Sequence, residues 1–236
     1  MLDFTGQVVI VIGAGGNLGA AITRALARQG ASLALADRQR PGLDRAAIGM
    51  EGAERLLMPG ADARTREGAT RIVAETMARF GRIDALVNTV GTFKMASVAD
   101  GAADDWSSLM DLNALSALRL SEAVLPPMLA KGYGRIVHVG AAAGQRSFAG
   151  ASVYAASKAA VLRITEAVSD ENKSHGVTAN CVLPGTIDTP QNRAAMPQAD
   201  PALWVTPDDI AAVVTFLVSR EAGAVTGVAL PVTGRQ

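Results

Sequence analysis

The 236-residue sequence is poor in cysteine, and Cys181 is the only one it contains. A single cysteine excludes an internal disulfide framework and fits a reducing compartment. Its setting, VTANCVLPG, is typical of a buried strand end, so we expect an inert thiol. The N-terminal apolar run is short and has no basic segment before it, which predicts neither a secretory signal nor a membrane span. We therefore expect a cytoplasmic protein.

An excess of charge of one sign is also missing. The 22 Lys and Arg residues balance 22 Asp and Glu residues, and the charges are scattered without runs. A surface that binds nucleic acid or an anionic membrane usually carries a basic patch, so we expect neither partner. The two histidines, His138 and His175, have no neighbours at metal-ligand spacing, so no metal site is expected.

Apolar segments of strand length recur along the chain and alternate with segments of helical spacing. The candidate strands are residues 7–13, 31–37, 54–60, 82–88, 134–140, 177–185 and 227–232. Residues 17–30 show helical spacing, as does the segment from Asp62 to Phe80, which Gly81 follows at the expected C-cap. This alternation predicts an α/β fold: one doubly wound domain over residues 1–236. Its parallel sheet has about seven strands and helices on both faces, with functional sites at the carboxyl ends of the strands.

A glycine-rich turn, GAGGNLG, follows the first predicted strand. Gly13, Gly16 and Gly19 permit a tight turn and close approach of the backbone to a pyrophosphate, next to a helix N-terminus that favours anions. The G-x-G-x-x-G pattern is not met in full, because Leu18 occupies the last position. A turn that only lets the helix pack closely on the strand therefore stays an alternative to a dinucleotide site.

Polar residues also end the next three predicted strands. Asp37 can accept hydrogen bonds from the adenosine ribose and would repel a 2′-phosphate, which favours NAD(H). The adjacent Arg38 keeps NADP(H) possible. Asp62 has two open roles, as a partner of the adenine amino group or as a helix N-cap. Asn88 either lines the cofactor site or only fastens neighbouring strands.

Four motifs in order, GxxGxLG, VNTVG, YAASK and LPGTIDT, resemble those of the short-chain dehydrogenase/reductase family over essentially the whole chain. The resemblance implies a Rossmann-type sheet, a nicotinamide cofactor, hydride transfer and a catalytic set of Asn, Ser, Tyr and Lys. These positions fall on Asn113, Ala141, Tyr154 and Lys158, so alanine stands where the serine is usual. The cofactor-binding residues that the motifs and the resemblance together imply are Gly13, Gly16, Asn17, Leu18, Asp37, Arg38, Asp62, Ala63, Asn88, Val90, Gly91, Tyr154, Lys158, Pro184, Gly185, Ile187 and Thr189.

Tyr154 and Lys158 are four residues apart, about one helical turn, and should face one site. A neighbouring ammonium and an oxidised nicotinamide both favour phenolate, so we expect the pKa of Tyr154 to be lowered. The phenol would then exchange a proton with the substrate as hydride moves. By resemblance, Lys158 also holds the nicotinamide ribose, and Asn113 links Lys158 to solvent through a water.

Ala141 leaves three explanations open. Gln145, Ser147 or Ser152 supplies the second hydrogen-bond donor; the substrate is electron-poor enough not to need one; or the protein binds cofactor with little turnover. The lid, at about residues 187–206, resembles that of the dihydropteridine reductases of the family, which also carry alanine here. That resemblance implies a flat, quinonoid dihydropterin-like substrate, and a carbonyl or alcohol oxidoreductase is the alternative.

Other residues complete the expected site. The candidate substrate contacts are Phe93, Gln145, Asn192 and Met196, and Trp204 is expected to anchor the lid on the core. The helices predicted around residues 116–129 and 156–168 are rich in alanine and leucine. Because the family commonly pairs these helices between subunits, we expect a homodimer or homotetramer that acts on a small molecule.

Overall fold

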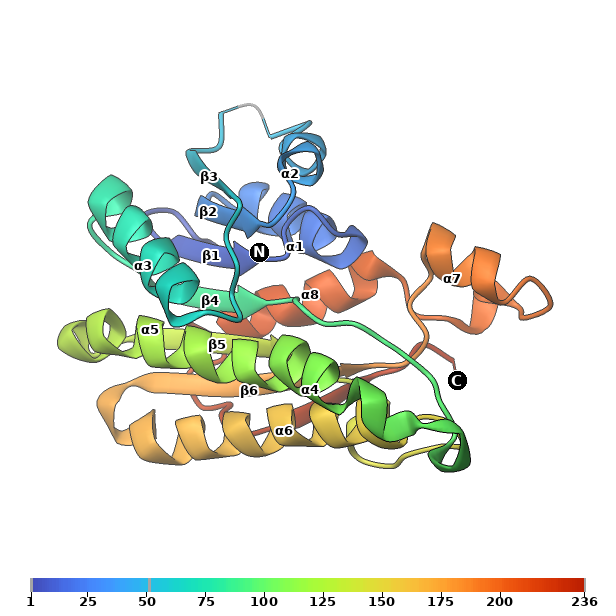
Figure 1. Cartoon of the computed structure of the whole chain (residues 1–236). Helices are drawn as coiled ribbons and strands as arrows, with labels where there is room; N and C mark the ends of the chain where they lie inside the picture. Colours follow the sequence, from blue (N-terminus) through green and yellow to red (C-terminus); the bar gives the residue numbers. More distant parts are fainter. Residues whose placement is uncertain (1, 51, 236) are drawn as a thin grey trace.

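The computed structural model describes residues 2–50 and 52–235, and a seven-stranded parallel sheet forms their centre (Figure 1). The strands are β1 (Val8–Ile12), β2 (Ser32–Asp37), β3 (Arg55–Pro59), β4 (Ala85–Asn88), β5 (Gly134–Val139), β6 (Val177–Pro184) and β7 (Ala229–Val232). The helices are α1 (Asn17–Ala27), α2 (Arg40–Ala46), α3 (Arg66–Phe80), α4 (Trp106–Leu109), α5 (Ser116–Lys131), α6 (Ser152–Asn172), α7 (Pro190–Ala195) and α8 (Pro207–Val218).

The strand order is β3-β2-β1-β4-β5-β6-β7, and every neighbouring pair is parallel. Each predicted strand is present, and the predicted Rossmann-type sheet is confirmed. The order reverses between β1 and β4, where the chain crosses from one half of the sheet to the other. Ligands of doubly wound folds bind beyond the carboxyl ends of the strands at such a reversal.

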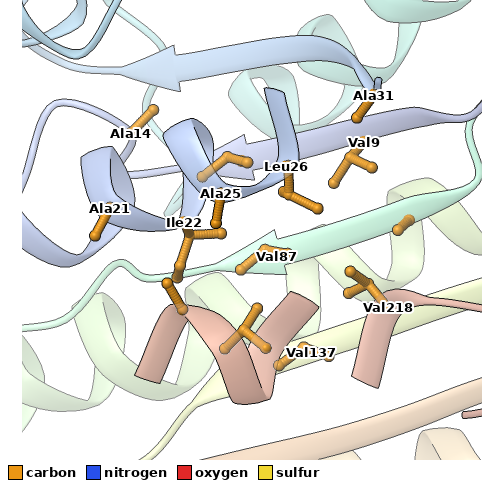
Figure 2. Packing of buried hydrophobic residues seen from close by; sticks show 14 of the residues in the cluster. Val9, Ala14, Ala21, Ile22, Ala25, Leu26, Ala31, Val87, Val137 and Val218 are labelled. Carbon is orange, nitrogen blue, oxygen red and sulfur yellow. The ribbon is translucent and has the colours of Figure 1, made fainter. Parts of the chain in front are cut away.

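Both faces of the sheet are covered, which explains the continuous apolar strands. Along β1, Val9 and Val11 pack with α1 and α8, whereas Ile10 and Ile12 face the layer of α3 and α5. Figure 1 shows α1 and α8 on one side of the sheet and α3, α5 and α6 on the other. In the first layer, Ile22 of α1 lies close to the sheet (Figure 2).

The loop between β3 and α3 decides which residue is the N-cap of α3. Thr65, not Asp62, is the N-cap of α3, and its hydroxyl accepts a hydrogen bond from the Gly68 amide at 3.0 Å. The N-cap role considered for Asp62 is therefore wrong, because α3 starts three residues later than Asp62 would require. The C-cap prediction is confirmed, since Gly81 ends the helix at φ +72°.

The segment expected to form a lid leaves the sheet after β6, and α7 extends beyond the strand ends in Figure 1. Its two ends meet in an isolated bridge between Ile187 and Val205. Trp204 is 6% exposed, so it anchors this segment on the body as expected. The side-chain amide of Asn17 donates to the side-chain oxygen of Gln191 at 2.8 Å. This hydrogen bond joins α7 to the start of α1.

Candidate active site

Helix α6 carries both Tyr154 and Lys158 toward the carboxyl ends of β4 and β5. The Lys158 side chain is buried, and its ammonium donates to the Val139 carbonyl at 3.0 Å. Val139 is the last residue of β5, so this hydrogen bond fixes the ammonium at the end of the strand. Burial lowers the pKa of Lys158 to about 8.

Asn113 lies in a π-helical turn, Met110–Leu115, between α4 and α5. Such turns interrupt the regular helix and are frequent at functional sites. The side-chain oxygen of Asn113 accepts from the backbone amide of Thr92 at 2.8 Å. The side-chain NH₂ group of Asn113 donates to the Ser157 hydroxyl at 2.9 Å. Ser157 in turn donates to the Tyr154 carbonyl at 2.7 Å. Asn113 therefore ties the loop after β4 to the turn of α6 that carries the phenol.

Sequence reasoning missed Ser157. A signal was present, because residues three apart in a helix share a face, and Ser157 follows Tyr154 by three positions within YAASK. Its side chain is fully buried. The hydroxyl both accepts and donates, so it holds Asn113 and α6 in a fixed relation.

The surroundings of Tyr154 are apolar. Tyr154 packs against a small buried cluster of Ala141, Ala143 and Ala155, and the Phe93 ring lies 4.8 Å from the Tyr154 ring, centroid to centroid, at 88°. This edge-to-face arrangement is a favoured one for aromatic pairs. Phe93 is also half exposed, so it is available to a ligand beside the phenol.

The lowering of the Tyr154 pKa that was expected from the Lys158 ammonium is not found, and the lowering expected from an oxidised nicotinamide stays a prediction. Burial raises the pKa of Tyr154 to about 12 instead of lowering it. The physical reason is that the phenol loses hydration among apolar neighbours, while the Lys158 ammonium is directed at the Val139 carbonyl. The ammonium alone therefore does not stabilise the phenolate, and the group is a neutral donor near pH 7.

Gly91, in the loop after β4, packs directly against two of the candidate catalytic side chains. A Cβ atom on Gly91 would lie 2.8 Å from the Lys158 nitrogen and 3.0 Å from the Asn113 carbonyl oxygen. Any side chain there would displace the groups proposed to act in catalysis. Glycine thus lets the Lys158 ammonium and the Asn113 side chain approach the backbone next to Val90.

The glycine-rich turn after β1 lies beside Thr89, which follows β4. Gly13 has φ +75°, and its Cβ would meet the Thr89 hydroxyl at 2.6 Å, so the position requires glycine twice over. The Thr89 hydroxyl donates to the Ile12 carbonyl at 2.8 Å. Gly16 is the N-cap of α1 and has no side chain to cap the first turn, where Asn17 and Leu18 follow. Such an N-terminus suits the phosphates of a dinucleotide.

The Asp37 carboxylate is fixed beside this turn. It accepts from the Gly15 amide at 3.1 Å and from the Gln39 amide at 3.0 Å. Asp62 lies near, and its neighbour Arg64 binds it through two nitrogens, the closer at 2.6 Å. Hydrogen bonding from Arg64 lowers the pKa of Asp62 to about 2. Two backbone amides therefore hold the Asp37 carboxylate in place beside the glycine-rich turn.

The remaining candidate residues are distributed around the same end of the sheet. Thr189 caps α7 by accepting from the Asn192 amide at 3.2 Å, and the Asn192 side chain donates to the Ile187 carbonyl at 2.8 Å. Gln145 is exposed, and Met196 is 38% exposed. Ala63 is buried beyond β3, Arg38 is exposed beyond β2, and Pro184 and Gly185 lie at the end of β6.

Other site types find no support in the described part of the chain. Residues 2–50 and 52–235 contain no group of three His, Cys, Asp or Glu side chains placed to hold a metal. Cys181 is fully buried, and burial raises the pKa of its thiol to about 11, as expected for an inert cysteine. No helix in those residues is both long and apolar enough to span a membrane.

Comparison with known proteins agrees with this geometry. Residues 7–200 match the family model for short chain dehydrogenases. The 3-oxoacyl-acyl-carrier-protein reductase FabG of Vibrio cholerae is 33% identical over an alignment of 243 positions, which covers 99% of this chain and 98% of the relative. The crystal structure of levodione reductase superposes with a TM-score of 0.90 at 30% identity, covering 98% of this chain and 97% of that one.

A mutant of a Serratia marcescens short-chain dehydrogenase/reductase superposes with a TM-score of 0.89 at 29% identity, covering 98% of both chains. The family match spans most of the sequence and includes the glycine-rich turn, Asn113, Tyr154 and Lys158. The chain belongs to the short-chain dehydrogenase/reductase family and is an NAD(P)-dependent oxidoreductase.

Proposed function

We propose that this enzyme transfers hydride between NAD(H) and a small, flat substrate with a conjugated acceptor, such as a quinonoid dihydropterin. The observation that carries the proposal is the apolar wall around the proton donor. Ala141 and Ala143 pack against Tyr154, and Phe93 stands edge-to-face with it. A carbonyl oxygen that needs two donors would face a methyl group at Ala141, whereas an electron-poor ring needs one proton and gains an apolar surface.

Tyr154, Lys158 and Asn113 have distinct roles in this proposal. The reduced nicotinamide supplies the hydride when it is bound. Burial keeps the Tyr154 phenol protonated at neutral pH, so it donates its proton to the substrate atom that becomes basic. Lys158, fixed on the Val139 carbonyl, presents its remaining N–H groups to the nicotinamide ribose. Asn113 holds the Thr92 backbone and Ser157, which keeps the phenol in place.

The preference for NAD(H) over NADP(H) rests on Asp37. Two backbone amides hold its carboxylate beside the glycine-rich turn, so the negative charge cannot turn away without losing both hydrogen bonds. A 2′-phosphate placed there would meet like charge. Arg38 is exposed and is the group that would favour the phosphate.

Carbonyl reduction is the second candidate, and the relatives favour it. The names 3-oxoacyl-acyl-carrier-protein reductase and levodione reductase both denote carbonyl substrates for those relatives. For this chemistry a donor must replace the missing serine hydroxyl, and Gln145, Ser147 and Ser152 lie in the segment between Ala141 and Tyr154. Ser147 is exposed and makes a long contact of 3.4 Å to the Phe148 carbonyl, so its hydroxyl is available to a ligand.

A matched pair of variants separates the two candidates. NADH consumption is measured with a quinonoid dihydropterin and with a cyclic ketone, for the unmodified enzyme, Ala141→Ser and Ala142→Ser. The proposal predicts pterin turnover that Ala141→Ser leaves unchanged. It also predicts ketone reduction that rises with Ala141→Ser by up to about 10²–10³-fold, the usual effect of one such donor. Ala142→Ser is the control and changes neither reaction.

The outcomes are distinguishable. Ketone reduction by the unmodified enzyme that Ala141→Ser does not improve supports a substitute donor and contradicts the pterin proposal. Binding of NADH without turnover of either compound supports the third explanation, a cofactor-binding protein with little activity.

We also propose that the enzyme is a homodimer or homotetramer that pairs through α5 and α6, and that residues 187–206 form a lid. On α5, Leu118 is 47% exposed and Leu129 is 38% exposed, so this helix offers apolar side chains to a second subunit. The Asn17–Gln191 hydrogen bond gives the lid a contact with the glycine-rich turn. Light scattering tests the assembly, and a monomer at micromolar concentration would contradict it.

A further inference from the structure

A buried chain of hydrogen bonds runs from α5 through β5 to the wall of the cofactor site. The Ser121 hydroxyl donates to the Ala117 carbonyl at 2.9 Å and lies 3.0 Å from Nε2 of His138. Nδ1 of His138 lies 3.5 Å from the Asn88 amide nitrogen. The side-chain oxygen of Asn88 accepts from the backbone amide of Val90 at 3.1 Å.

The Val90 amide at one end of this hydrogen-bond chain can only donate, and the Ala117 carbonyl at the other end can only accept. These two groups determine the position of every proton between them. The Val90 amide can only donate, so the Asn88 oxygen faces it and the Asn88 NH₂ group faces His138. Nδ1 of His138 must therefore be an unprotonated acceptor, and the ring proton lies on Nε2. Nε2 donates to the Ser121 hydroxyl, which passes its own proton to the Ala117 carbonyl.

The other assignments leave donors facing donors. A proton on Nδ1 of His138 would oppose the Asn88 NH₂ group. If the Asn88 amide flipped to relieve this, its NH₂ group would oppose the Val90 amide. Because His138, Asn88 and Ser121 are each at most 2% exposed, no water can reach the opposed donors to accept a hydrogen bond from them. The network is consistent with one tautomer alone.

The chain ends where the cofactor site begins. Val90 stands between Thr89, whose hydroxyl binds the Gly13 carbonyl at 3.3 Å, and Gly91, which faces the Lys158 nitrogen. The side chain of Asn88 fixes the backbone conformation of this turn, because its oxygen accepts a hydrogen bond from the backbone amide of Val90.

We propose that His138, as the neutral Nε2–H tautomer, is a positioning residue for dinucleotide binding. It orients the Asn88 amide, and the amide fixes the Val90–Gly91 turn against which the dinucleotide lies. His138 acts through Asn88 and is not itself a catalytic residue. The inference concerns the cofactor and holds whichever substrate the enzyme reduces.

Two substitutions separate positioning from packing. His138→Leu keeps much of the ring volume but removes the acceptor at the δ position. His138→Asn leaves a larger void but places an acceptor oxygen at that position. Dissociation constants are measured by titration with NADH or NADPH, whichever the unmodified enzyme binds more tightly, together with the melting temperature of each variant.

We expect His138→Leu to weaken dinucleotide binding by on the order of 10-fold, the effect of one buried hydrogen bond left unmade. His138→Asn should stay within about 3-fold of the unmodified enzyme, even where its melting temperature is the lower of the two. The double variant with Asn88→Ala should bind no more weakly than Asn88→Ala alone, because both changes remove one coupling. Equal weakening by Leu and Asn, or additive effects with Asn88→Ala, would overturn the proposal.

A measurement on the unmodified protein keeps the test independent of folding. The ¹⁵N chemical shifts of the His138 ring distinguish the two tautomers and the imidazolium. The proposal requires the Nε2–H form at neutral pH, and a proton on Nδ1 would refute it.

Discussion

His138 also makes the stability of the fold depend on pH in a defined window. Burial, with a smaller contribution from the Lys158 ammonium, lowers the pKa of His138 from its ordinary 6.5 to about 4. Between these two values the unfolded chain binds a proton at this position and the folded chain does not. The free energy of unfolding therefore falls as the pH falls from 6.5, and the loss is complete near pH 4.

The size of the loss follows from the difference between the two pKa values. A difference from 6.5 to about 4 corresponds to about 3 kcal/mol, which is a large part of the stability of an ordinary domain. Carboxylates such as Asp84, whose pKa is lowered by its ion pairs with Arg82 and Lys131 despite burial, lose their contribution only at lower pH. The histidine window is thus separable from ordinary acid unfolding.

Urea unfolding at a series of pH values checks this. The free energy of unfolding is compared for the unmodified protein, for His138→Asn, and for His175→Gln, which removes the exposed histidine as a matched control. From pH 7 to about 4, the unmodified protein and the control should lose about 3 kcal/mol more than His138→Asn. Parallel curves for all three proteins would refute the reasoning that His138 is held neutral.

Three further predictions follow from single positions. Gly91→Ala places a methyl group 2.8 Å from the Lys158 nitrogen, so turnover should fall by at least about 10-fold with little loss of melting temperature; wild-type turnover would contradict the close approach. Asp37→Ala should narrow or reverse the preference for NADH over NADPH in binding titrations, and an unchanged ratio would remove Asp37 from cofactor recognition. Asp84→Ala removes the buried carboxylate that accepts from the Val8 amide and pairs with Lys131, so urea unfolding should show a loss of about 1–3 kcal/mol; an unchanged free energy of unfolding would contradict a structural role for Asp84.

The sequence was sufficient for the sheet because its inner strands are buried on both faces. Continuous apolar runs such as VVIVI of β1 stand out from the amphipathic helices between them, and the glycine at Gly81 marks a helix end by its positive φ. The N-terminus of α3 was less certain. Asp62 and Thr65 are both good capping residues in one short loop, and only the path of the backbone selects Thr65.

Parts of the site could not be predicted from residue types. The pKa of Tyr154 depends on which neighbours remove water from the ring, and Ala141, Ala143 and Phe93 come together from separate segments. The sequence shows Lys158 one helical turn away but not that its ammonium is directed at the Val139 carbonyl. The hydrogen-bond network of His138 likewise joins three elements that only the folded sheet brings side by side.

The role of Tyr154 as the proton donor is the claim on which the mechanism depends. The most direct test is the turnover of Tyr154→Phe with NADH and the substrate that the unmodified enzyme reduces, together with the dissociation constant for NADH. We predict a loss of turnover of about 10²–10⁴-fold, the range for removal of a general acid, while NADH binding is retained. Tyr154→Phe that turns over at the rate of the unmodified enzyme would contradict the account.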